Sequence, residues 1–241
     1  MGQSTMIAAT ILGGILSSAM LSQAAPLTVR QSGSSSTTSC NSGGGYPMTN
    51  TTTPPSTSGT TFSWGSYTGY PTSGTAVATI YPEYTSQYNV ATGAVNFNTA
   101  RGFVSRSYTN GGADSTAIVT FAVPAQYSQN WCRVAFGLEA AGSYASGSLK
   151  AQLFTSLAPA TASTTTWPSG NLRNQNIGAI DVVPGGEAVW QVGSGPAATS
   201  NGFFPCSLVA GQVFGGEVVP QGDQVEISWP AGQDGIKIMV Y

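Results

Sequence analysis

The sequence predicts an all-β domain, a two-sheet antiparallel sandwich of the jelly-roll type, behind a disordered N-terminal region. Short runs of alternating apolar and polar residues recur along the chain, and a period of two is typical of strands with one buried face. Proline and glycine interrupt these runs about every ten to fifteen residues, which is a spacing typical of all-β sandwiches. No apolar stripe at helical spacing is long enough to predict a helix.

The first residues of the chain have the pattern of a secretory signal peptide. An uncharged apolar run over residues 6–21 leads into Ser22-Gln23-Ala24, with small residues at the two positions that a signal peptidase reads. At about sixteen residues the run is short for a membrane span. We therefore predict a signal peptide over residues 1–24 and a secreted protein, extracellular or cell-wall associated, with no membrane span. Since the chain ends in a strand containing Lys237, we expect no lipid anchor.

Residues 25–62 are rich in Ser, Thr, Gly and Pro and contain few apolar side chains. Such a segment buries too little surface to offset the entropy of ordering, and we expect a disordered linker. Asn50-Thr51-Thr52 is a sequon and predicts N-glycosylation at Asn50, while the flanking Ser and Thr residues suit O-linked sugars. The alternative is an undecorated linker.

The β-sandwich domain is expected over residues 63–241. The alternating runs that predict its strands cover residues 117–123, 132–138, 149–154, 176–183, 188–192, 213–219, 225–229 and 236–240. Residues 230–235 form a turn by composition, so we expect the last two runs to form a hairpin or adjacent strands. Trp190 and Trp229 lie within alternating runs and are expected in the core, whereas Trp167 follows a Thr-rich stretch and is placed in a loop.

The composition excludes several classes of function. Only 7% of the residues are charged, against about 25% in ordinary soluble proteins, and the net charge is −2. Because the seven Lys and Arg residues are scattered, we do not expect nucleic acid as a partner. The chain has no histidine, which removes Ser-His and Cys-His nucleophile pairs and His-ligated metals. An enzyme of this composition would depend on its nine scattered carboxylates.

Three cysteines are present, and the oxidising compartment predicted above favours a disulfide between the two in the folded region. A bridge between Cys132 and Cys206 would close a loop of about 75 residues, worth roughly 4 kcal/mol in the chain-entropy model, and would join a strand to a distant segment, plausibly across the core. Pairing of these two would leave Cys40 as the third cysteine, without an intramolecular disulfide partner. Cys40 could form an intermolecular disulfide, carry a small thiol or remain free.

A series of short motifs resembles the fungal But-type C-terminal domain over residues 76–241. The motifs are Phe121-Ala122-Val123-Pro124, Trp131-Cys132-Arg133, Thr164-Thr165-Thr166-Trp167, Val182-Val183-Pro184-Gly185, Phe203-Phe204-Pro205-Cys206 and the closing Gly235-Ile236-Lys237-Ile238. The resemblance implies a fungal, extracellular or wall-associated β-sandwich. The family is associated with binding of a ubiquitin-like-protein activating enzyme. We do not expect that intracellular partner for an exported chain.

The candidate ligand-binding residues are aromatic side chains with polar neighbours. Tyr81, Glu83, Tyr84 and Tyr88 lie within one short segment, and tyrosine rings can stack on sugar rings while polar groups bind the sugar hydroxyls. Trp167 is the fifth candidate. The alternative is that the tyrosines pack over the edge of the sandwich. Asp223 and Asp234 lie in Gly-rich turns and are expected to form turns, so we predict neither a metal nor a cofactor.

These observations together predict a non-catalytic protein that acts by surface binding. The expected partner is cell-wall polysaccharide or an extracellular protein, such as a host component. One alternative is a hydrolase that uses a pair of carboxylates on polysaccharide. Another is a structural protein of the cell wall or coat.

Overall fold

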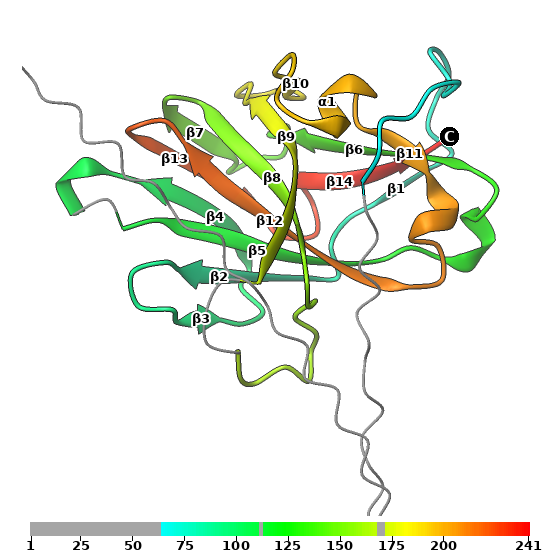
Figure 1. Cartoon of the computed structure of the whole chain (residues 1–241). Coiled ribbons are helices and arrows are strands. Elements are labelled where there is room, and N and C mark those ends of the chain that lie inside the picture. The colour runs from blue at the N-terminus through cyan, green and yellow to red at the C-terminus, as the bar shows by residue number, and fades with distance from the viewer. Residues whose placement is uncertain (1–63, 111–112, 168–171) are drawn as a thin grey trace, which may run out of the picture. The chain divides into compact units, whose positions relative to one another are not determined.

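The computed structural model describes residues 64–110, 113–167 and 172–241. The predicted signal peptide, most of the predicted linker, Cys40 and Asn50 lie outside them. The described chain is nearly all β and folds as the predicted antiparallel sandwich of two curled sheets (Figure 1).

The strands belong to a smaller sheet A and a larger sheet B. Sheet A has the strand order β1 (Ala78–Ile80), β14 (Gly235–Val240), β6 (Trp131–Gly137) and β11 (Phe203–Pro205). Sheet B has the order β10 (Val189–Trp190), β9 (Arg173–Asp181), β8 (Lys150–Ser156), β12 (Val213–Gln221), β5 (Ser115–Ala122), β4 (Arg101–Arg106), β13 (Val225–Pro230) and β7 (Tyr144–Gly147).

Two further strands extend sheet B beside this path. β2 (Tyr84–Asn89) pairs with β5 and with β3 (Val95–Asn96). The helices are short: η1 (Tyr108–Asn110), η2 (Ala125–Tyr127), α1 (Pro196–Thr199) and η3 (Cys206–Leu208). In Figure 1, β10 and α1 lie at the top, and β2 and β3 lie at the bottom, below β5.

The main core lies between the inner faces of the two sheets. Val119 and Phe121 of β5 point into it from sheet B, and Val134 and Phe136 of β6 point into it from sheet A. These are the alternating apolar positions that the sequence predicts, because successive side chains on a strand point to opposite faces. Trp190 and Trp229 belong to the same core, which confirms their prediction.

All eight predicted runs are strands, with small shifts at their ends. The strands that the patterns do not show are short or weakly apolar. β4 is an example: of its two buried positions, one is Val104 and the other is Gly102, whose space is filled by the indole of Trp229. A glycine at an inward position removes the apolar signal of a strand.

The expected hairpin between the last two strands is wrong. β13 pairs with β4 and β7 in sheet B, whereas β14 pairs with β1 and β6 in sheet A, so the chain crosses from one sheet to the other. The turn between them is held by Asp234, which is buried and accepts hydrogen bonds from the backbone N–H of Ala140 and the hydroxyl of Ser143. Alternation predicts a buried face, but it does not tell which of two facing sheets the strand joins.

The disulfide between Cys132 and Cys206 is present, as predicted, but it does not cross the core. Cys132 lies opposite Phe204 in the β6–β11 pair, and Cys206 directly follows β11. The bridge therefore joins neighbouring segments of sheet A that are 74 residues apart in sequence. Both cysteines are fully buried.

A second, smaller core lies on the outer face of sheet B. Its buried members are Tyr88, Ile118 and Ala160, and Phe97 and Trp167 pack against them. The segment from Leu157 to Trp167 supplies this cover, and the hydroxyl of Thr120 donates to the carbonyl of Ala160 at 2.7 Å. Because both of its faces are covered, β5 is buried on nearly every residue.

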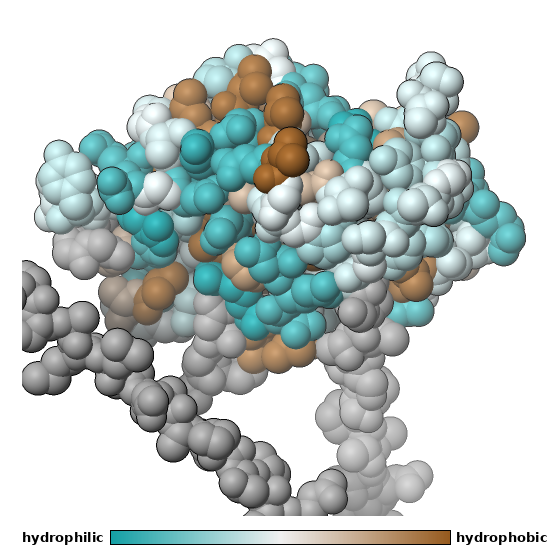
Figure 2. Space-filling model, turned by 45° about the horizontal axis from the view of Figure 1, so that its top comes forward, coloured by the Kyte–Doolittle hydropathy of each residue, from teal (hydrophilic) through white to brown (hydrophobic). Residues whose placement is uncertain are grey.

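The solvent-facing surface in Figure 2 is mostly hydrophilic or neutral, with small separate groups of apolar residues. No helix in the described residues has the length and the apolar character needed to cross a membrane.

Candidate functional site

The outer face of sheet A carries a hollow of about 380 Å³, which we call the aromatic hollow. Its lining residues are Tyr70, Pro71, Thr72, Ser73, Gly74, Arg133, Asn201, Phe203 and Tyr241. Small-ligand sites in proteins range over about 300–1,000 Å³. Four parts of the chain build it: the loop of residues 70–74, Arg133 of β6, the segment from Asn201 to Phe203 at the start of β11, and Tyr241 after β14.

Strand alternation places the side chains of the aromatic hollow. Cys132 and Val134 point into the core, so Arg133 between them points outward, and Phe203 lies directly opposite Arg133 in the β6–β11 pair. Tyr241 follows Val240, which is a core residue, and its backbone N–H donates to the carbonyl of Trp131 at 2.8 Å.

Four aromatic rings pack together beside the hollow. The ring of Tyr70 stacks on that of Phe203, with centroids 4.7 Å apart and an interplanar angle of 9°. Trp131 meets Tyr70 edge-on at 6.3 Å, and Tyr241 lies tilted against Phe203 at 5.2 Å. Because Phe203 is buried beneath its neighbours, the half-buried rings of Tyr70 and Tyr241 are the ones that offer surface to a ligand.

The cation in the hollow is fixed and neutralised. The guanidinium of Arg133 lies 5.8 Å from the centroid of the Phe203 ring and donates to the carbonyl of Asn201 at 3.2 Å. It also forms an ion pair with Glu187. The hollow therefore combines aromatic faces with hydroxyl and amide groups from Thr72, Ser73 and Asn201 but has little net charge.

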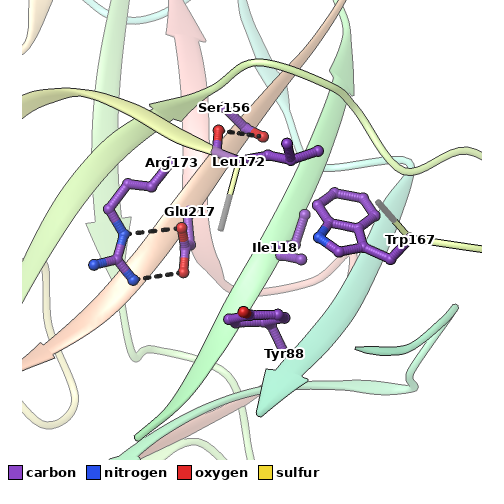
Figure 3. A pocket seen from close by; sticks show the side chains of 7 residues that line it. All are labelled: Tyr88, Ile118, Ser156, Trp167, Leu172, Arg173 and Glu217. Carbon is purple, nitrogen blue, oxygen red and sulfur yellow. Dashed lines mark hydrogen bonds and ion pairs between the residues drawn. The ribbon is translucent and has the colours of Figure 1, made fainter. Parts of the chain in front are cut away.

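The sequence-predicted residues occupy other places. Tyr88 and Trp167 lie on either side of Ile118 and line a space of about 10 Å³ on the outer face of sheet B (Figure 3). A space of that size holds about one water molecule, so no sugar ring fits there as it stands. Glu83 is exposed, and Tyr81 and Tyr84 are half-buried; none of these three lines the small space or the aromatic hollow.

The candidate residues therefore do not share one groove, and their role in binding stays a prediction. The binding residues predicted from the sequence do not include Tyr70, Arg133, Phe203 or Tyr241. The outward positions of the strands were a usable signal for the last three, because each follows or precedes an inward core residue. No sequence pattern places the loop residue Tyr70 over Phe203.

Beside the small space in Figure 3 lies a buried ion pair. Arg173 donates from Nε and Nη2 to the two carboxylate oxygens of Glu217, at 3.0 and 2.8 Å, and Thr116 donates its hydroxyl to the same carboxylate at 2.6 Å. The Glu217 side chain is only 4% exposed. These three hydrogen bonds link β5, β9 and β12.

Most carboxylates of the described residues are engaged in similar contacts. Five of them form ion pairs: Asp114, Glu139, Asp181, Glu187 and Glu217. Asp234 holds a turn, as predicted, and Glu226 accepts a hydrogen bond from Tyr144. The aromatic hollow is lined by no carboxylate side chain and the small space by Glu217 alone, and the described residues contain no cluster of three or more potential metal ligands.

Lys237 shows how such a pair changes ionisation. Burial alone would lower the pKa of Lys237, but a hydrogen bond to Glu139 at 2.9 Å and the nearby negative charge outweigh it and raise the pKa. Tyr81 lies close enough to contribute in the same direction. Tyr81 directly follows β1 of sheet A, whereas Tyr88 lies in β2 of sheet B.

The chain was compared with known proteins. No protein-family model matches it, and no curated protein matches it either. The resemblance to the fungal But-type C-terminal domain therefore stays a resemblance.

Proposed function

We propose that this protein is exported and binds a neutral cell-wall polysaccharide through the aromatic hollow, without catalysing a reaction on it. The observation that carries the proposal is the Tyr70–Phe203 stack, which presents a tyrosine face beside a hollow of about 380 Å³. Sugar rings have apolar faces and polar edges, and an aromatic face surrounded by hydroxyl and amide groups complements both.

The charge of the site favours a neutral sugar. Arg133 is paired with Glu187, so an uncharged ligand would leave no charge unpaired in the hollow. The buried disulfide supports the location outside the cell, because disulfides persist in oxidising compartments. The signal-peptide pattern supports it independently.

The test is a glycan array, followed by calorimetry with neutral glucan, mannan and chitin fragments. We expect Tyr70→Ala to weaken binding at least tenfold, since stacking on the ring is lost. Asn201→Gly should weaken it less: it removes one amide, and glycine tolerates the positive φ of 50° at this position. Tyr108→Ala removes an exposed tyrosine that lies outside the hollow and should leave binding unchanged.

Tyr84→Ala compares this site with the one that the sequence predicts. Loss of binding in Tyr84→Ala but not in Tyr70→Ala would overturn the assignment to the aromatic hollow. A folded protein that binds no glycan on the array would overturn the proposal itself and favour a structural wall or coat protein. Release of sugar from the fragments would favour the hydrolase.

A further inference from the structure

Arg101 differs from the other cations of the described residues in having no carboxylate partner. Arg30 lies outside these residues, and five of the remaining six Lys and Arg side chains form ion pairs. Arg101 is nevertheless held in place at the start of β4. Its Nε donates to the hydroxyl oxygen of Ser228 at 2.9 Å, and its Nη2 donates to the carbonyl of Gly142 at 2.7 Å.

These two hydrogen bonds leave part of the guanidinium free. Of the five N–H donors of an arginine, three remain without a partner among the described residues: both on Nη1 and one on Nη2. Parallel donors on Nη1 and Nη2 form the fork that accepts a carboxylate through two hydrogen bonds. Because Ser228 and Gly142 already fix the side chain, a ligand would lose little entropy in ordering it.

Arg101 lines a hollow of about 460 Å³, which we call the arginine hollow. Its other lining residues include Gln87, Asn96, Thr99, Phe103, Tyr144 and Ser228. Within the described chain, the side-chain amides of Gln87 and Asn96 make no hydrogen bond, although the two residues lie directly opposite each other in the β2–β3 pair. They offer donors and acceptors to a ligand, and the 45% exposed side chain of Tyr144 offers a ring face.

No carboxylate lines the arginine hollow. The nearest acid along β13 is Glu226, two residues from Ser228, and it accepts the hydroxyl hydrogen of Tyr144 at 2.7 Å instead of pairing with Arg101. The whole chain has a net charge of −2, so long-range attraction does not draw acidic polymers to it. An acidic ligand would have to be held by local contacts.

We propose that the arginine hollow binds the carboxylate of a uronic acid unit in an acidic polysaccharide. Arg101 would hold the carboxylate, and Gln87, Asn96 and Thr99 would meet the sugar hydroxyls beside it. The inference rests on the proposed function only in taking a glycan as the ligand, since the two hollows are built from different residues. In Figure 1, β7 and β13 lie at the left, whereas β11 and the C-terminus lie at the right.

The test measures binding of the full chain to immobilised polygalacturonate and to a fully methyl-esterified polymer of the same length. We expect binding to the acid but at least tenfold weaker binding to the ester, and Arg101→Gln should lose this difference. Lys150→Gln makes the same change of charge at an exposed lysine outside the hollow and should have no effect. If Arg101→Gln does not fold, Asn96→Ala should weaken binding to the acid with the charge retained.

Further ligands identify the source of the carboxylate. Free galacturonate should compete with the polymer, whereas inorganic phosphate at equal ionic strength should not. Equal binding to acid and ester, or equal losses in Arg101→Gln and Lys150→Gln, would overturn the inference. Tyr70→Ala should leave polygalacturonate binding intact even where it abolishes binding of neutral glycans, so the failure of one site is distinguishable from that of the other. Binding of the acid that depends on Tyr70 and not on Arg101 would overturn this inference alone.

Discussion

Gly102 of β4 lies directly against the indole of Trp229, and a Cβ atom at position 102 would lie 2.0 Å from Cε2 of that ring. Because position 102 has no side chain, the Trp229 ring of the neighbouring strand β13 can pack directly on the backbone of β4. Trp229 is fully buried, so its ring cannot move toward solvent to make room.

We therefore expect Gly102→Ala to destabilise the domain by about 3 kcal/mol, the upper end of the usual cost of overpacking a core. Chemical denaturation of the two proteins measures the change. Gly65→Ala is the matched control, since its new Cβ would lie 3.5 Å from the Tyr67 ring, an ordinary contact. Equal stability of Gly102→Ala and the unmodified protein would show that the core around Trp229 can make room for a methyl group at position 102.

The buried ion pair between Arg173 and Glu217 predicts a large effect of a small change. Glu217→Gln leaves the guanidinium without its carboxylate in a mostly buried position, and we expect a loss of about 3–5 kcal/mol in the free energy of unfolding. Asp181→Asn breaks a pair whose side chains are about half exposed, and it should cost under about 1 kcal/mol. Urea titrations of both variants compare them, and similar costs would contradict the buried role of Glu217.

Lys237 predicts a dependence of stability on alkaline pH. Its pKa is raised in the folded protein, so the stabilisation from this residue is fully present below its unfolded pKa of about 10.4 and is lost as the pH rises through the higher folded value. Glu139→Gln removes the partner and should cost about 1 kcal/mol at pH 7, since Glu139 is largely exposed. The difference between the two proteins should shrink above about pH 10.5, as measured by denaturation midpoints. A difference that stays constant from pH 7 to beyond this range would argue against the pair.

The disulfide closes a long loop and should contribute to stability through the unfolded chain. Because the two cysteines are 74 positions apart in sequence, replacing both Cys132 and Cys206 by alanine should lower the free energy of unfolding by about 2–4 kcal/mol. Cys40→Ser should leave it unchanged, because the sequence places Cys40 in the linker. Non-reducing electrophoresis of the same variant shows whether Cys40 joins two chains.

Much of the fold could be predicted because the inner faces of the strands carry a strong pattern. Phe121 and Phe136 alternate with less apolar neighbours, and burial of such side chains is the main driving force of folding. The assignment of β13 and β14 to different sheets could not be predicted, because both strands bury one face in the same core from opposite sides. The pattern is identical for either sheet.

The candidate sites were harder to predict than the core. Arg133 and Phe203 meet only because β6 and β11 pair, although 70 residues separate them in sequence. Nothing in the sequence distinguishes Arg101 from the other Lys and Arg residues. Its lack of a carboxylate partner is a property of the folded chain. Tyr88 was selected for its neighbours in sequence, whereas its neighbours in space are Ile118 and Ala160.

The position of β14 has a consequence for biosynthesis. This strand lies inside sheet A, between β1 and β6, yet the ribosome makes it after every other described strand. Until its residues emerge, β1 has no partner in that sheet and one edge of β6 stays open, so the nascent chain exposes unpaired backbone. Sheet A therefore cannot close until the residues of β14 have been made, and the strands that emerge earlier must avoid edge-to-edge association until then.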